Sequence, residues 1–259
     1  MVEKKAGLKV SDKELIDLLN RARYEVKIEK NKIDVEFSSY RVDLMHPVDV
    51  VEDILISYGY NNIIPSRIEM GVVGSEQPLS IYVESIKIGC IGISLQEIIT
   101  YNLTSKDTQK TNLFLEDELV EINNAISNNF EILRKRISPQ VLDFFSKNKG
   151  VEFPQRVFEI GNCVSPDSTS PTGVRQTMNI CIASTHSNVN FTEIKSILVA
   201  LCNYMGVECV VQKKAFPFLN ENSAEIIVNG KKGFIGELKK EVIDNFGLRK
   251  PVALLEFEL

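Results

Sequence analysis

The stretch between Pro65 and Pro78 constrains the fold of this chain most, because it separates two segments with different residue patterns. It holds two glycines and shows little hydrophobic periodicity. Glycine and proline between periodic segments are typical of a linker. We therefore expect two domains, one over residues 1–67 and one over residues 68–259.

The first segment has the pattern of a small helical module with one hairpin. A Ser-x-x-Glu capping box precedes a helix expected over residues 12–23. Alternating polar and apolar residues over 24–28 and 32–37 predict a hairpin, and a second helix is expected over residues 49–59. The order helix, hairpin, helix indicates a winged-helix-like module.

The second segment alternates helices and strands irregularly. Its clearest signal is a hairpin around Asn229-Gly230, a dipeptide that favours a type I′ turn. Helices are expected over 79–91, 191–205 and 240–246, strands over 97–103, 119–122, 156–161, 177–184 and 252–258, and one long or two short helices, broken near Pro139, over 130–147. This pattern predicts a mainly antiparallel sheet flanked by helices, so the expected fold class is α+β.

Composition excludes several classes of protein. With 44% hydrophobic and 25% charged residues, the chain has the make-up of a soluble globular protein. No apolar run approaches the roughly 20 residues that cross a bilayer, and no signal peptide is evident, so we expect a cytoplasmic protein without membrane contact. A net charge of −5 argues against a wholly basic nucleic-acid coat, although a local basic face would still allow RNA contact.

Four carboxylates form the densest polar group in the sequence. Asp49, Glu52 and Asp53 have the spacing i, i+3, i+4, which places them on one face at the start of a helix, and Asp43 precedes them. Mg²⁺ commonly binds such carboxylate oxygens. It needs only one or two carboxylates and keeps several water ligands. Asp49 as a helix N-cap, with Glu52 as its capping-box partner, explains the same pattern. The two interpretations are compatible.

Catalytic motifs are absent from the sequence. The chain lacks a Walker phosphate loop, a dinucleotide-binding G-x-G-x-x-G and a nucleophile elbow. His46 lies in a turn before a helix, where packing or hydrogen bonding is the commoner role, and His186 lies in a polar loop. We therefore expect no catalytic residue in this chain.

Three motifs in the first segment resemble a known family. They are Tyr-Arg-x-Asp at 40–43, His-x-x-Asp-x-x-Glu-Asp at 46–53 and Tyr-Gly-Tyr-Asn-Asn-Ile at 58–63. Together they resemble the fifth module of the phenylalanyl-tRNA synthetase beta subunit, which is winged-helix-like in that family. Further segments follow in family order at 97–103, 133–134, 154–161, 226–231, 236–238 and 251–256. The likeness covers nearly the whole chain and is greatest to the archaeal and eukaryotic type.

The resemblance implies a magnesium site and a domain without activity. The magnesium ligands, shared with the alpha subunit, would be Asp43, Asp49, Glu52 and Asp53. Residues 68–259 would form a class II synthetase-like domain that has lost catalysis, because the family's catalytic arginine near the C-terminus has no counterpart here. ATP would be used by the complex and not bound by this chain. The partners would be the alpha subunit, in an α2β2 heterotetramer, and tRNA through that complex.

Two functions follow as alternatives. The first is a structural, alpha-subunit-binding part of the beta subunit, which supports ATP-dependent attachment of phenylalanine to tRNA by the alpha subunit. The second is a free-standing paralogue that acts as an RNA-binding or regulatory protein. Departures from the family pattern favour the second: Asn124-Ala125 replaces Asn-Pro, Lys239-Lys240 replaces His-Pro, and Asn222-Ser223-Ala224 replaces Gly-Arg-Ala.

Overall fold

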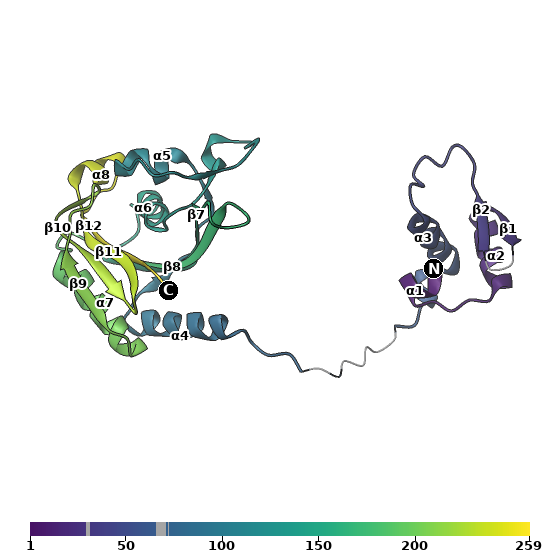
Figure 1. The fold of residues 1–259 in the computed structure, drawn as a ribbon, viewed down its shortest axis with the longest axis horizontal. Helices are drawn as coiled ribbons and strands as arrows, with labels where there is room; N and C mark the ends of the chain where they lie inside the picture. The colour runs from purple at the N-terminus through teal and green to yellow at the C-terminus, as the bar shows by residue number, and fades with distance from the viewer. Residues whose placement is uncertain (30–31, 66–70, 72) are drawn as a thin grey trace. The chain divides into compact units, whose positions relative to one another are not determined.

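The computed structural model of the protein describes residues 1–29, 32–65, 71 and 73–259. These residues form two compact units, Met1–Gly74 and Ser75–Leu259 (Figure 1). The expected domain boundary, after residue 67, lies outside the described residues. Within the described part of the chain, no helix has the length and apolarity to cross a membrane.

In the first unit α2, one antiparallel hairpin and α3 follow in the order expected from the sequence, and a short helix that was not expected, α1, precedes them. Ser11 caps α2 by accepting a hydrogen bond from the Glu14 N–H at 3.3 Å, which is one half of the expected capping box. Leu18, Leu19, Tyr24 and Ile54 form the core, which packs α2 against α3. The elements are α1 (Val2–Ala6), α2 (Asp12–Arg21), β1 (Glu25–Glu29), β2 (Lys32–Glu36), α3 (Pro47–Tyr58) and the 3₁₀ turn η1 (Tyr60–Asn62).

The second unit is built on one large sheet. In the described residues this sheet has seven strands in the order β3-β7-β8-β12-β11-β10-β9, antiparallel except for the parallel pair β3 and β7. The expected hairpin is confirmed, since Asn229 (φ 48°) and Gly230 (φ 77°) both have the positive φ of a type I′ turn. The strands are β3 (Gln96–Glu97), β7 (Gln155–Pro166), β8 (Val174–Thr185), β9 (Cys209–Lys213), β10 (Leu219–Val228), β11 (Lys231–Leu238) and β12 (Val252–Glu258).

Helices cover both faces of this sheet (Figure 1). Strand residues alternate between faces, so Leu254 of β12 packs with α6 and α8 while Leu255 packs with α4 and α7. A sheet that is apolar on both faces needs such cover, which gives an α+β unit with two apolar layers. The helices are α4 (Pro78–Gly92), α5 (Lys106–Gln109), α6 (Ser138–Lys147), α7 (Phe191–Met205) and α8 (Lys240–Asn245).

Two expectations for this unit were wrong. The strand expected over 97–103 is divided between β3 and the short β4 (Leu103–Thr104). The helix expected over 130–147 starts only at Ser138, since proline is tolerated in a first turn and Pro139 therefore begins the helix instead of breaking it. The preceding residues join a small sheet of β4, β6 and β5. The remaining elements are η2 (Thr111–Leu113), β5 (Val120–Glu121), η3 (Asn128–Phe130) and β6 (Ile132–Leu133).

Candidate functional site

The helix that carries the predicted carboxylates starts earlier than the sequence pattern indicated. α3 begins at Pro47, and His46 is the N-cap residue, whose Nδ1 accepts a hydrogen bond from the Val48 N–H at 3.2 Å. The Asp49 carboxylate accepts hydrogen bonds from the backbone N–H groups of Met45 (2.8 Å) and His46 (2.7 Å). Asp49 is therefore the capping partner of His46 and not the N-cap residue itself. The helix can start at Pro47 because the nitrogen of a proline in the first turn needs no hydrogen bond.

Asp43 and Asp53 are joined by one arginine. Nη2 of Arg41 lies 2.7 Å from an oxygen of Asp43 and 2.7 Å from an oxygen of Asp53, and its Nε lies 2.9 Å from the other Asp43 oxygen. The hydroxyl of Tyr24 also donates to Asp53. The loop before α3 is thereby tied to the start of β1 and to the body of α3.

The electrostatics of this group follow from these contacts. The hydrogen bond from Arg41 lowers the pKa of Asp43, and the bonds to Asp43 and Asp53 raise the pKa of Arg41. Burial, together with the hydrogen bond to Asp53, raises the pKa of Tyr24 to about 12. At neutral pH Tyr24 is therefore protonated, Arg41 is charged and the Asp43 carboxyl is ionised.

The four predicted ligands do not form a metal centre by themselves. Asp43 and Asp53 face a guanidinium, Asp49 faces backbone N–H groups, and Glu52 is exposed on the helix surface. Among the residues that the structure describes, no group of three or more histidine, cysteine, aspartate or glutamate side chains could hold a metal ion. Their arrangement is that of a cap and an ion-pair network, and Mg²⁺ binding stays a prediction.

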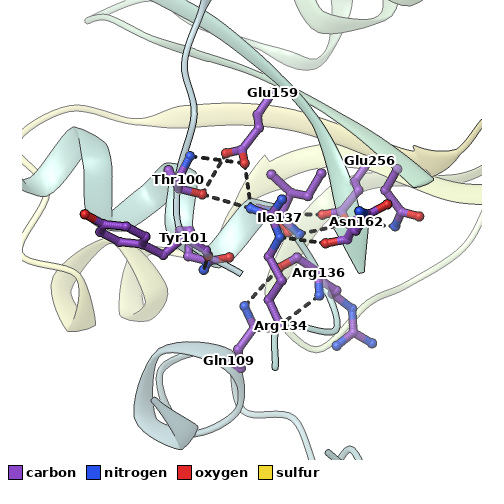
Figure 2. Close-up of polar contacts among 12 residues, drawn as sticks. Thr100, Tyr101, Gln109, Arg134, Arg136, Ile137, Glu159, Asn162 and Glu256 are labelled. Carbon is purple, nitrogen blue, oxygen red and sulfur yellow. Dashed lines mark hydrogen bonds and ion pairs between the residues drawn. The ribbon is translucent and has the colours of Figure 1, made fainter. Parts of the chain in front are cut away.

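A second polar cluster lies on the large sheet, under the start of α6 (Figure 2). Glu159 of β7 and Glu256 of β12 flank Cys181 of β8 in the same register row. Burial raises the pKa of the Cys181 thiol, so it is not a thiolate nucleophile at neutral pH. The chemistry of this row therefore depends on its two carboxylates.

Glu159 is held by a buried arginine. Arg134 Nη1 lies 2.6 Å from Glu159 Oε1, and Arg134 also donates to the hydroxyl of Thr100 (2.9 Å) and the carbonyl of Asn162 (2.8 Å). Thr100 donates to both oxygens of Glu159 through its N–H (3.2 Å) and hydroxyl (2.8 Å). Figure 2 shows this network, in which the guanidinium of Arg134 and the carboxylate of Glu159 bond to each other and to neighbouring protein groups.

Glu256 holds the start of α6. Its two oxygens accept hydrogen bonds from the N–H groups of Ile137 (3.0 Å) and Ser138 (2.9 Å), and Asn179 donates a third at 3.1 Å. The side chain of Gln109 fixes the preceding residues by bonding to the N–H and the carbonyl of Arg136. A carboxylate at a helix N-terminus is favourable, so Glu256 fixes α6 over the sheet.

The roles of these residues are not evident from the sequence pattern. Arg134, Glu159 and Glu256 lie in stretches that carry the family resemblance, but no role was assigned to them. The available signal was a single charged residue within an apolar strand run, as in Val-Phe-Glu-Ile at 157–160 and Leu-Leu-Glu-Phe at 254–257. Such a residue must be paired when the strand is buried.

The outer face of α4 is an exposed apolar surface. Ile86 and Cys90 are buried against the sheet, whereas Ile81, Ile88 and Ile91 are each more than half exposed. Residues 81, 88 and 91 recur at helical spacing, so they share one face. The exposed Glu84 and Ser85 lie between Ile81 and Ile88 on this face, so the surface is apolar with polar residues interspersed.

Comparison with known proteins identifies the family. Residues 49–259 match the model of the phenylalanyl tRNA synthetase beta chain CLM domain, and residues 1–60 match that of the tRNA synthetase B5 domain. The chain belongs to the phenylalanyl-tRNA synthetase beta chain family. The resemblance recognised in the sequence motifs is thereby confirmed.

Archaeal beta subunits are among the relatives of this chain. The phenylalanine–tRNA ligase beta subunits of Thermococcus sibiricus and Pyrococcus furiosus are 36% and 37% identical to this chain over its whole length. The match covers 47% of each relative, so the chain spans about half the length of these beta subunits.

A solved synthetase structure has a fold similar to that of this chain. The pyrrolysyl-tRNA synthetase of Desulfitobacterium hafniense superposes with a TM-score of 0.56, over 70% of this chain and 66% of that one. Sequence identity is 11%, so the likeness concerns the fold alone. The class II-like, α+β character expected for the larger domain is therefore confirmed.

Proposed function

We propose that this chain is the structural, alpha-subunit-binding part of a phenylalanine–tRNA ligase beta subunit. In this role it supports ATP-dependent attachment of phenylalanine to tRNA, a reaction carried out by the alpha subunit. The family match over the whole chain supports the proposal, since a beta subunit implies an alpha partner. The complex would be a cytoplasmic α2β2 heterotetramer that binds ATP and tRNA.

The observation that carries the proposal is the exposed apolar face of α4. Ile81, Ile88 and Ile91 project from a helix whose opposite side is already packed on the sheet. Subunit interfaces that form permanently are rich in apolar area, so an uncovered apolar helix face is suited to a partner subunit. α4 is therefore the proposed contact with the alpha subunit.

The polar cluster of the second unit fits a scaffold better than a catalyst. Arg134 and Glu159 bond to each other, and Glu256 is saturated by backbone and amide donors. A general base or a substrate clamp needs a group free to contact the substrate. The proposal therefore assigns these residues to stability and assigns no catalytic residue to the chain.

The first unit is proposed as a winged-helix-like module that shares Mg²⁺ with the alpha subunit. Its helix, hairpin, helix order supports the first part of this statement. For the second part, Asp43, Asp49, Glu52 and Asp53 would need to rearrange in the assembled ligase, because Arg41 occupies the space between Asp43 and Asp53. Mg²⁺ needs few protein ligands, so ligands from both subunits would suffice.

Co-expression with an alpha subunit of the same organism tests the interface. Ile88→Asp places a charge at the centre of the proposed contact and should abolish co-purification with the alpha subunit. Ile126→Asp is the matched control, since Ile126 is fully exposed in the same unit and lies outside α4. Equal retention of both variants by the alpha subunit would exclude α4 as the contact.

A second candidate function is RNA binding by a free-standing paralogue. One observation favours it: a cavity of about 230 Å³ is lined by Lys135, Arg136, Arg175 and Lys232 together with the acids Glu256 and Glu258, and among these basic residues Lys135, Arg136 and Arg175 form ion pairs. Phosphate contacts release counterions, so RNA binding would weaken steeply with salt. Salt-dependent tRNA binding by the isolated chain, lost in Lys232→Gln, would support this candidate, and absence of binding at low salt would exclude it.

A further inference from the structure

Arg41 occupies the position that a cation would take among the acidic residues of the first unit. It contacts Asp43 through Nε and Nη2 and Asp53 through the same Nη2, with the closest distances at 2.7 Å. A guanidinium that bonds to two carboxylates at once neutralises their mutual repulsion in a fixed geometry.

The surroundings of Arg41 hold it in place. Its guanidinium carbon lies 5.8 Å from the ring centroid of Tyr24, and the Tyr24 hydroxyl donates to the same Asp53 oxygen that Arg41 contacts. Tyr24 is only 4% exposed and belongs to the core between α2 and α3. The site of Arg41 is thus built from the folded core and not from the surface loop alone.

The other two carboxylates have no need of a metal ion. Asp49 accepts two backbone hydrogen bonds at the N-terminus of α3, where negative charge is favourable. Glu52 is exposed to water. Every acidic residue of the predicted metal site therefore has a compensating environment within this chain.

We propose that Arg41 is the resident counter-cation of this acidic cluster. The first unit is folded and electrostatically compensated without a divalent ion, and a divalent ion binds Asp43 and Asp53 only when the Arg41 side chain is displaced or removed. Arg41 holds the carboxylates of Asp43 and Asp53 in place, and this charge compensation is present in the isolated chain. It goes beyond the proposed function, because it holds whether or not an alpha subunit binds.

The test uses the full chain without a partner. Arg41→Met removes the charge but keeps an unbranched side chain, and Arg21→Met, at an exposed arginine of α2, is the matched control. Mn²⁺ is the probe, because it broadens the amide NMR signals of residues near its binding site. We expect broadening around Asp43 and Asp53 in Arg41→Met, reversed by Mg²⁺, and none in the wild type or the control at the same Mn²⁺ concentration.

Thermal unfolding gives a second readout. EDTA should leave the melting temperature of the wild type unchanged, whereas Arg41→Met should melt lower in EDTA and recover with Mg²⁺. If Arg41→Met does not fold, Arg41→Lys retains one positive charge without the double contact and should show weaker broadening of the same amides. Equal broadening of wild type and Arg41→Met, or none in either Arg41 variant, would overturn the proposal.

Discussion

Arg134 and Glu159 form a fully enclosed ion pair, with 2.6 Å between Nη1 and Oε1 and with each side chain only 2% exposed. Removing one partner of a buried pair leaves an uncompensated charge, which costs about 3–5 kcal/mol of unfolding free energy. Arg134→Met should therefore destabilise the second unit by about this amount, as measured by urea unfolding.

Arg175→Met is the matched control for this prediction. Arg175 pairs with Glu258 at 2.9 Å, but its side chain is half exposed. Loss of an exposed pair costs roughly 0–1 kcal/mol. Equal destabilisation by both variants would show that burial does not determine the contribution of the Arg134 pair.

Gly161 provides an independent test of how tightly Arg134 is packed. A Cβ atom added at Gly161 would lie 2.1 Å from Nη2 of Arg134, so a side chain there must push the guanidinium away. Gly161→Ala should cost about 1–3 kcal/mol, the usual range for overpacking in a core. Gly150→Ala, where no atom lies within 4 Å of the added Cβ, should change the unfolding free energy little.

Glu256 should control the stability of α6. Glu256→Gln keeps the shape of the side chain but removes the charge from the start of the helix, so amide hydrogen exchange across Ser138–Lys147 should become faster. Glu258→Gln changes an acid two residues along the same strand that bonds to Arg175 and Lys231. Exchange in α6 should stay the same in that variant, and faster exchange in both would contradict the assignment.

Glu193 should make the stability of the second unit depend on pH. Burial alone would raise the pKa of Glu193. Hydrogen bonds from His186 and Ser184 and the charges of His186 and Arg156 lower this pKa by more than burial raises it, so the net pKa lies below its usual value. A carboxylate with a lowered folded-state pKa stabilises the fold above its unfolded pKa of about 4.3. This stabilisation is lost as pH falls through the folded pKa.

The measurement is the free energy of unfolding between about pH 5 and pH 3. The wild type should lose stability more steeply than Glu193→Gln, because the variant has no carboxylate to protonate at this position. Parallel curves would show that Glu193 does not contribute to acid unfolding.

The elements that the sequence predicted well are those with local causes. Asn229-Gly230 requires positive φ at both residues, and the hairpin formed there. The helix expected over residues 191–205 has the same bounds in the structure, because Asn190 caps it and Gly206 ends it in a left-handed conformation. In both places a few neighbouring residues determine the conformation.

The interactions that could not be predicted join distant residues. Glu256 bonds to Ile137 across 119 positions, and Glu159 bonds to Arg134 across 25. Spacing within one helix placed Asp49 and Asp53 on a shared face, but it could not reveal that Arg41 would reach Asp53 or that Asp49 would turn to the backbone of His46. Tertiary contacts, which local patterns do not encode, decide these partners.

The central claim is that this chain binds an alpha subunit, and the mass of the co-expressed proteins tests it most directly. The chain and the alpha subunit of the same organism would be produced together and examined by size-exclusion chromatography with light scattering. We expect one particle that contains both chains in equal amounts and is heavier than either alone. A monodisperse monomer of this chain, eluting apart from the alpha subunit, would contradict it.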